Sequence, residues 1–227
     1  MKNLSMKHHL VVLLAVLNLL VFQSCQSQTP KNPQHLGEGT GDFDLDQLTF
    51  KEDVNALFSK VNYIKLPHKD AFYDKVKKEE VIRDTLAFEY KVSKADRAKV
   101  NTYFLDKSLN HRMVFFFVDK KNQFKAFSFF ASKKDGDFSK QIELIDKKYK
   151  KYKVNLKPDK RRDFADAKAY QWESPDKIIS VTMSTKPADG EYTMGLTVVD
   201  KKTDFKKFPI NQFIYGNSVC LDNTCKE

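Results

Sequence analysis

The chain has 227 residues, with 40 lysines and arginines against 30 acidic residues and a formal net charge of +10. This length can bury one ordinary hydrophobic core or two small cores packed together. Only five of the basic residues are arginine, whose planar guanidinium suits specific recognition of phosphates and bases. The composition therefore argues against a dedicated nucleic-acid-binding protein.

The N-terminus has the layout of an export signal. The first nine residues carry two lysines and no acidic residue, and an apolar run from Leu10 to Phe22 follows. A membrane-spanning helix needs about 20 apolar residues, so this run is too short to be an anchor by itself. We therefore expect residues 1–24 to be a signal peptide.

Ser24 and Cys25 directly follow the apolar run. This junction resembles the signal of bacterial lipoproteins. The resemblance implies that Cys25 is lipidated, becomes the new N-terminus and anchors the chain in the cell envelope, at the outer membrane or its periplasmic face. Phe22 and Gln23 depart from the usual residues of that signal, so two alternatives stay open. Cleavage near Ser27 would release a soluble secreted protein, and an uncleaved chain would stay cytoplasmic or membrane-tethered.

The segment after Cys25 has the composition of a tether. Residues 26–41 contain three glycines and two prolines with almost no apolar side chains, so we expect a flexible tether over residues 25–42. Its GEGTG stretch has no strand before it, which disfavours a phosphate-binding loop. The adjoining DFDLD stretch, residues 42–46, has aspartates at calcium-loop spacing, but Gln47 replaces the glycine that such a loop needs.

Two segments of the remaining chain, residues 49–61 and residues 138–152, have apolar side chains at helical spacing. Thr49 and Glu52 have the spacing of a capping box at the start of the first segment. The sequence predicts an amphipathic helix in each.

Other segments have the pattern of strands. Residues 111–131 are two apolar runs divided by a polar turn, which predicts an antiparallel hairpin. Residues 177–185 and 191–200 predict a second pair. Pro209 ends the following strand or places it at a sheet edge. For residues 66–82, a second helix and the approach to a strand both fit.

The sequence also contains an internal repeat. VDKKNQFKAF at residues 118–127 and VDKKTDFKKF at residues 199–208 are identical at seven of ten positions. Weaker matches, in the predicted helices and in two alternating segments, occur in the same order. We therefore expect an α+β fold of two tandem repeats, residues 43–132 and 133–227, each a helix followed by an antiparallel meander.

This order of elements resembles the tandem-repeat fold of the β-lactamase inhibitor protein and of related small outer-membrane lipoproteins. The resemblance covers most of residues 43–227 and is one of pattern, without a shared diagnostic motif. It implies an interaction module in which helices cover one face of a sheet and the other face binds protein partners. It transfers no inhibitory residue to this chain.

Aromatic residues are concentrated in the predicted strands. We expect them to fill two aromatic cores or to form an exposed sheet face, which would be the binding surface. The run from Phe115 to Phe117 is apolar at every position, so alternation does not say which ring points outward. The residues concerned are Phe88, Tyr90, Phe115, Phe117, Phe127, Phe129, Tyr170 and Trp172.

Cys220 and Cys225 are the other two cysteines of the chain. We expect a disulfide between them, because exported chains meet oxidants and two such close cysteines can reach bonding geometry. A pair of free thiols is the alternative. A zinc site needs about four ligands, and no second cysteine or histidine pair at ligand spacing exists, so we expect no metal site.

The most basic segment lies at the end of the second predicted helix. Its lysines alternate with Tyr149 and Tyr152, which could stack on bases or meet anionic lipid headgroups. The same tyrosines continue the apolar stripe of the helix, and lysines favour the dipole at a helix C-terminus. We expect a solvated helix face, with weak binding to an anionic envelope surface as the alternative and no nucleic-acid binding. The basic residues are Lys147, Lys148, Lys150, Lys151, Lys153, Lys157, Lys160, Arg161 and Arg162.

No catalytic motif is present. The sequence has no G-x-S-x-G, H-E-x-x-H or Walker pattern, and neither His68 nor His111 lies in a motif that supplies a cysteine or serine nucleophile. We therefore expect no catalytic residue and no cofactor. The expected function is a non-catalytic, lipid-anchored envelope module that binds an envelope protein or a glycan. An enzyme of unknown reaction, secreted or in the envelope, is the alternative.

Overall fold

The computed structural model describes residues 32–38, 42–109, 111, 113–157, 166–214 and 219–227. The predicted signal peptide and the predicted lipidation site Cys25 lie outside the described residues, as do Lys160, Arg161 and Arg162. Within the described residues, no helix has the length and apolar character needed to cross a membrane.

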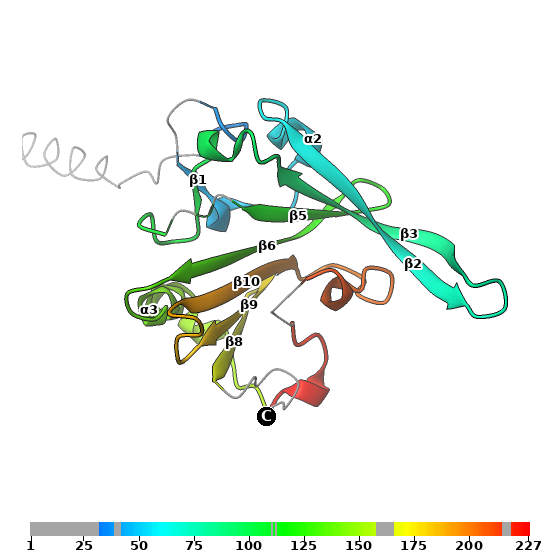
Figure 1. Cartoon of the computed structure of the whole chain (residues 1–227). Coiled ribbons are helices and arrows are strands. Elements are labelled where there is room, and N and C mark those ends of the chain that lie inside the picture. The colour runs from blue at the N-terminus through cyan, green and yellow to red at the C-terminus, as the bar shows by residue number, and fades with distance from the viewer. Residues whose placement is uncertain (1–31, 39–41, 110, 112, 158–165, 215–218) are drawn as a thin grey trace, which may run out of the picture. The chain divides into compact units, whose positions relative to one another are not determined.

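An antiparallel sheet of eight strands runs through the molecule (Figure 1). The order across the sheet is β2-β3-β5-β6-β10-β9-β8-β7, and each neighbouring pair is antiparallel. A separate parallel ladder joins β1 (Phe43–Asp44) to β4 (Thr102–Tyr103). The strands of the sheet are β2 (Tyr63–Asp74), β3 (Glu79–Val92), β5 (Val114–Asp119), β6 (Phe124–Lys133), β7 (Lys153–Val154), β8 (Ala167–Glu173), β9 (Lys177–Ser184) and β10 (Tyr192–Asp200).

Helices are few in the described part of the chain. The α-helices are α2 (Val54–Leu57) and α3 (Ser139–Tyr149). The short 3-10 helices are η1 (Leu45–Gln47), η2 (Arg97–Lys99), η3 (Lys150–Tyr152), η4 (Ile210–Gln212) and η5 (Asn223–Cys225).

The predicted α+β fold of two tandem repeats is wrong. Among the described residues the protein is mostly β, and α3 is the only helix longer than about one turn. The first VDKK segment leads into β6, whereas the chain after the second segment forms turns and no strand up to Pro209. β10 already pairs with β6 on one side and β9 on the other, so a strand that followed it would find no free edge.

The predicted helix over residues 49–61 is reduced to the four residues of α2. The capping-box contact does form, since the Thr49 N–H donates to the Glu52 side chain at 2.9 Å. Phe50, however, adopts a left-handed backbone with φ of 64°, and its ring packs 5.0 Å from that of Phe124. Packing of this ring into the core therefore overrides the helical pattern.

Other predicted elements are confirmed. α3 and η3 cover the second predicted helix, β5 and β6 form the predicted hairpin, and β9 pairs with β10. The unassigned residues 66–82 belong to the long β2–β3 hairpin. Since β3 pairs with β5 only over Ala87–Lys91, the tip of this hairpin extends beyond the rest of the sheet (Figure 1).

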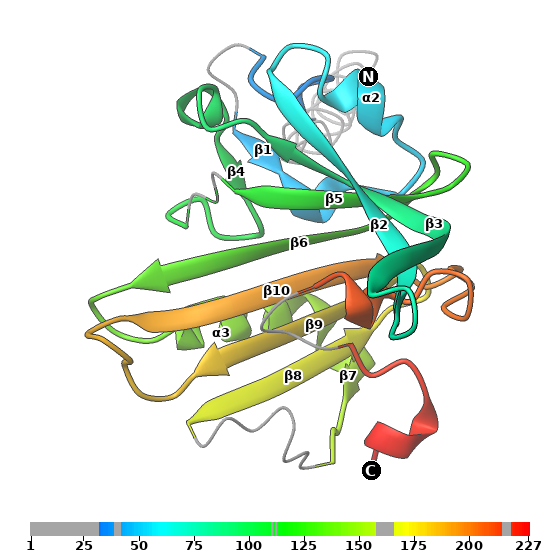
Figure 2. The same ribbon diagram turned by 45° about the vertical axis from the view of Figure 1, so that its right-hand side comes forward.

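The two faces of the sheet have separate hydrophobic cores. The inner face packs against α2, α3 and Leu36, so the folded unit begins within the segment predicted to be a tether. The outer face packs against residues 204–214 and 219–227, here called the C-terminal cover. Figure 2 shows α3 and the C-terminal cover on opposite sides of β8–β10. Of the predicted aromatic residues, Phe115 and Phe117 belong to the outer face; those of the inner core are Phe88, Tyr90, Phe127, Phe129, Tyr170 and Trp172.

Candidate binding surface on the outer face

The C-terminal cover lies over one end of the outer face. Phe208 and Phe213 pack edge to face with ring centroids 5.3 Å apart, and Phe213 lies 6.4 Å from Phe117 of β5. Together with Ile210, these rings belong to a buried cluster that also contains Ile178 of β9. At this end the apolar side chains of the sheet are removed from water, which stabilises the fold.

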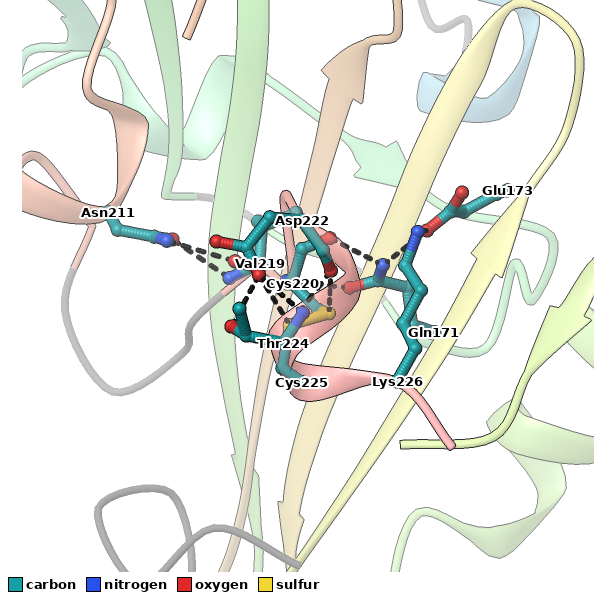
Figure 3. Close-up of a disulfide and its surroundings, with 9 residues drawn as sticks. All are labelled: Gln171, Glu173, Asn211, Val219, Cys220, Asp222, Thr224, Cys225 and Lys226. Carbon is teal, nitrogen blue, oxygen red and sulfur yellow. Dashed lines mark hydrogen bonds and ion pairs between the residues drawn. A yellow bond between two sulfur atoms is a disulfide. The ribbon is translucent and has the colours of Figure 1, made fainter. Parts of the chain in front are cut away.

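A disulfide and the Asn211 bonds connect parts of the cover to one another, and the Gln171 bonds tie the cover to the sheet (Figure 3). The predicted bond between Cys220 and Cys225 is confirmed. Gln171 of β8 donates to the Cys220 carbonyl at 2.8 Å and accepts from the Cys220 N–H at 2.9 Å. In the same way, the Asn211 side chain donates to the Val219 carbonyl at 2.9 Å and accepts from the Val219 N–H at 2.8 Å. The backbone of the cover is therefore held to the sheet without being a strand.

The other end of the outer face is open. Four large apolar side chains are exposed there: Ile64 (39%) and Leu66 (40%) of β2, Met113 (38%) next to β5, and Phe130 (37%) of β6. Strand register places Ile64 and Leu66 on the same face as Phe130. Scattered apolar residues are normal on a surface, but a group on one face marks a candidate interaction site.

A groove of about 350 Å³ lies where the C-terminal cover stops. Phe213 and Ile214 line it from the cover, and rings of β5 and β6 line it from the sheet. Within the aromatic run, Phe116 points into the inner core and its two neighbours point to the outer face. The lining residues are Glu89, Lys91, Phe115, Phe117, Ser128, Phe130, Phe213 and Ile214.

Glu89 places a buried carboxylate at the wall of this groove, since only 6% of the residue is exposed. Lys91 Nζ donates to it at 2.9 Å, and His68 Nε2 lies 3.2 Å from its other oxygen. Burial works to raise the pKa of Glu89, but the hydrogen bonds from His68 and Lys91 outweigh burial and hold that pKa below its usual value. The carboxylate is thus ionised and neutralised by its own neighbours.

Part of the basic segment around α3 contributes to the fold. Tyr149 is buried and its hydroxyl donates to the Asp46 carboxylate at 2.6 Å, and Lys148 forms an ion pair with the same group. Burial, with the carboxylate beside it, raises the pKa of the Tyr149 phenol. Lys153 pairs with Asp146 at 2.7 Å. All the described lysines of the segment are exposed, including the paired Lys148 and Lys153; the others are Lys147, Lys150, Lys151 and Lys157.

The two candidate histidines lie in different environments. His68 borders the groove, where its ring centroid is 4.7 Å from that of Phe213. His111 is buried on the inner face and stacks on Phe129 at 3.7 Å. Burial lowers the pKa of His111 to about 4, although Asp106 opposes this shift. Among the described residues, no side-chain hydroxyl or thiol is hydrogen-bonded to either ring in a way that would make a nucleophile.

Sequence reasoning missed Glu89 and Lys91 as site residues. Glu89 and Lys91 alternate with Phe88 and Tyr90, a pattern that indicates the polar face of a strand. This pattern could have identified the two residues as candidates for the site. The burial of Glu89 beside Phe213 depends on the C-terminal cover, which has no strand or helix period, and so could not be read from the pattern.

Within the described residues, no group of three or more histidine, cysteine or acidic side chains is arranged to hold a metal ion. Comparison of the chain with protein-family models, curated proteins and solved structures finds no match in any of the three. The candidate site is therefore defined by its own geometry: an apolar groove with a neutralised ion pair, continued by exposed aliphatic and aromatic side chains.

Proposed function

We propose that the protein is a non-catalytic binding module of the bacterial cell envelope, attached through a lipid on Cys25, and that the open end of its outer face binds a protein partner. The observation that carries the binding proposal is the group of Ile64, Leu66 and Phe130, exposed on one face beside an apolar groove, with Met113 exposed next to β5. Protein interfaces combine such an apolar centre with a polar rim.

A protein fits this surface better than a small ligand. At about 350 Å³ the groove is near the lower limit for small-molecule sites. The exposed side chains extend away from it along β2 and β6, which a single small molecule would leave uncovered. A side chain of a partner in the groove, with its neighbours on the exposed residues, would cover the whole region.

Affinity isolation from envelopes, followed by binding measurements on the retrieved partner, tests the binding proposal. Leu66→Ser and Phe130→Ser should each weaken the affinity about tenfold, as expected for truncation near an interface centre. Val76→Ser is the matched control, because Val76 is 92% exposed but lies at the tip of the β2–β3 hairpin. Equal affinities for all variants would refute the assignment of the surface.

Metabolic labelling with a clickable fatty acid tests the anchor. The wild-type chain should carry the label and fractionate with membranes, and Cys25→Ala should lose both properties. Unlabelled wild-type protein with an intact N-terminus would contradict the envelope location.

An enzyme is the second candidate, because His68 and Glu89 form a hydrogen-bonded pair at the edge of the groove. Histidine and a carboxylate in contact are the usual parts of a general base. If the pair is catalytic, His68→Ala should abolish turnover of a substrate bound in the groove while the fold is retained. If the surface only binds, this variant should lower affinity moderately and no turnover should be found.

A further inference from the structure

The two VDKK turns of the internal repeat lie side by side at one end of the central strands β5, β6 and β10. The first joins β5 to β6, and the second follows β10. They are neighbours because β6 pairs with β10 and register places Ala126, near the start of β6, opposite Val199, near the end of β10. A pocket of about 540 Å³ between them is lined by residues of both turns and by the base of the β2–β3 hairpin.

This pocket is strongly basic. It is lined by Lys120, Lys121, Lys125, Lys202, Lys206 and Lys207. Three aspartates also line it, and each already has a lysine partner: Asp84 pairs with Lys120, Asp119 with Lys125 at 3.7 Å, and Asp204 with Lys207 at 3.3 Å. The carboxylates are therefore neutralised by half of the lysines.

The other three lysines, Lys121, Lys202 and Lys206, have no ion-pair partner within the described part of the chain. All three are exposed, so they can reorient towards a ligand. Like charges brought together repel one another, and a bound anion relieves that repulsion. The pocket thus has a local excess of positive charge that the protein itself leaves uncompensated.

A second feature of the pocket is an unused hydroxyl. Thr203 lines the pocket and is 8% exposed, and its Oγ1 is buried without a hydrogen-bond partner among the described residues. Buried hydroxyls normally have a partner, because leaving one unpaired costs free energy. A rotation of roughly 120° about χ1 moves the hydroxyl to another staggered position, where a ligand in the pocket would supply the partner that the hydroxyl lacks.

We propose that this pocket binds a multivalent oxyanion of the phosphate-ester class, with Lys121, Lys202 and Lys206 supplying charge and Thr203 a hydrogen bond. Lysine binds phosphate as a point charge without fixed geometry, which suits a group of several phosphates more than one planar anion. Leu86 and Phe208 add apolar lining beside the lysines and accommodate the carbon portion of an ester. This site is separate from the groove of the proposed protein partner.

Calorimetric titration of the purified full-length chain with tripolyphosphate at low salt tests the proposal. Lys121→Gln/Lys202→Gln/Lys206→Gln should weaken binding about tenfold, since each exposed lysine contributes a fraction of a kcal/mol. The matched control Lys147→Gln/Lys150→Gln/Lys151→Gln removes the same charge from exposed lysines at the end of α3, and should change the affinity less than about twofold. Equal weakening in both triple variants, or no binding by the wild type, would overturn the proposal.

Two further experiments distinguish a specific binding site from general attraction by charge, and identify the source of the ligand. Thr203→Val changes no charge and should weaken tripolyphosphate binding, whereas Thr203→Ser should preserve it; an unchanged affinity in Thr203→Val would also overturn the proposal. Cosedimentation of the Cys25→Ala chain, which carries no lipid, with phosphatidylcholine vesicles that contain phosphatidic acid tests a membrane source. If the headgroup is the ligand, the chain should sediment and tripolyphosphate should release it; if a free ester is the ligand, only tripolyphosphate should bind.

Discussion

The two ends of the outer face are built by the same strands but meet different surroundings. At one end the C-terminal cover buries Phe117, Ala126 and Ile178 beneath its own rings. At the other end Leu66 and Phe130 stay partly exposed, and neither belongs to the buried cluster of the outer face. The covered end shows how this face is stabilised inside the molecule, and the open end has the same kind of surface without that covering.

The boundary between the two ends is the groove. Phe213 and Ile214 line it from the cover, and Phe130 lines it from the open end. The cover stops beside a neutralised carboxylate, Glu89, and not beside a charged surface that would repel an apolar partner. The outer face therefore carries apolar side chains at both ends, and the protein's own chain covers only one of these ends.

The largest expected loss of stability comes from truncating a buried ring of the C-terminal cover. Phe213→Ala should lower the free energy of unfolding by about 3 kcal/mol, because it removes a buried ring and leaves a cavity. Phe130→Ala makes the same chemical change at the open end and should cost less than about 1 kcal/mol. Urea denaturation of both variants measures the difference. Equal losses would mean that the two ends do not differ in burial.

The next largest effect is the loss of stability in acid, and it acts on the inner core. His111 has a folded-state pKa of about 4, below its ordinary value of 6.5, so the unfolded chain takes up the proton first as the pH falls. This group therefore contributes to stability above pH 6.5, and the contribution, about 3 kcal/mol, is lost progressively down to pH 4. Chemical denaturation across this range should show the loss, and His111→Phe should flatten the curve; a curve of unchanged slope would refute a neutral buried His111.

A smaller loss of stability is expected from removing the Cys220–Cys225 disulfide of the cover. Cys220→Ser/Cys225→Ser should lower the free energy of unfolding by about 2 kcal/mol, because the bond closes only a short loop. Cys25→Ser is the control and should leave stability unchanged, since Cys25 precedes the unit Asn32–Glu227 to which both cysteines of the disulfide belong. Faster hydrogen exchange of the Gln171 side-chain amide in the double variant would show that the disulfide orders the cover. Stability equal to that of the wild type would mean that the side-chain hydrogen bonds alone hold the cover in place.

The smallest effect on stability is expected at the open end itself. Leu66→Ser should change the free energy of unfolding by less than about 0.5 kcal/mol, because the side chain is already in contact with water. A thermal melt checks this value. Destabilisation comparable to that of Phe213→Ala would indicate that Leu66 supports the fold, and its use as a binding probe would then be invalid.

The sequence predicted the local elements well where one pattern dominated. The apolar stripe with Ile142 and Ile145 became α3, and the polar turn between two apolar runs became the β5–β6 hairpin. The close pair Cys220 and Cys225 formed its disulfide. These features depend on neighbours in sequence, which is why periodicity and spacing were sufficient.

Features that depend on distant partners were not predictable. The second VDKK segment matches the first in sequence, but β10 has both edges occupied, so Phe205 and Phe208 follow it in turns and pack on the outer face. Phe50 leaves a helical pattern because its ring meets Phe124. The candidate groove combines β3, β5, β6 and the C-terminal cover, and no local pattern records which residues meet across such a distance.

The most direct test of the binding surface is site-specific photo-crosslinking in living cells. Benzoylphenylalanine in place of Phe130 lies at the edge of the groove, and the same residue in place of Glu143 lies exposed on α3, which packs on the opposite face. A discrete protein adduct is expected from position 130 and none from position 143. No adduct from position 130, or the same adduct from both positions, would contradict the assignment of the open end as the binding surface.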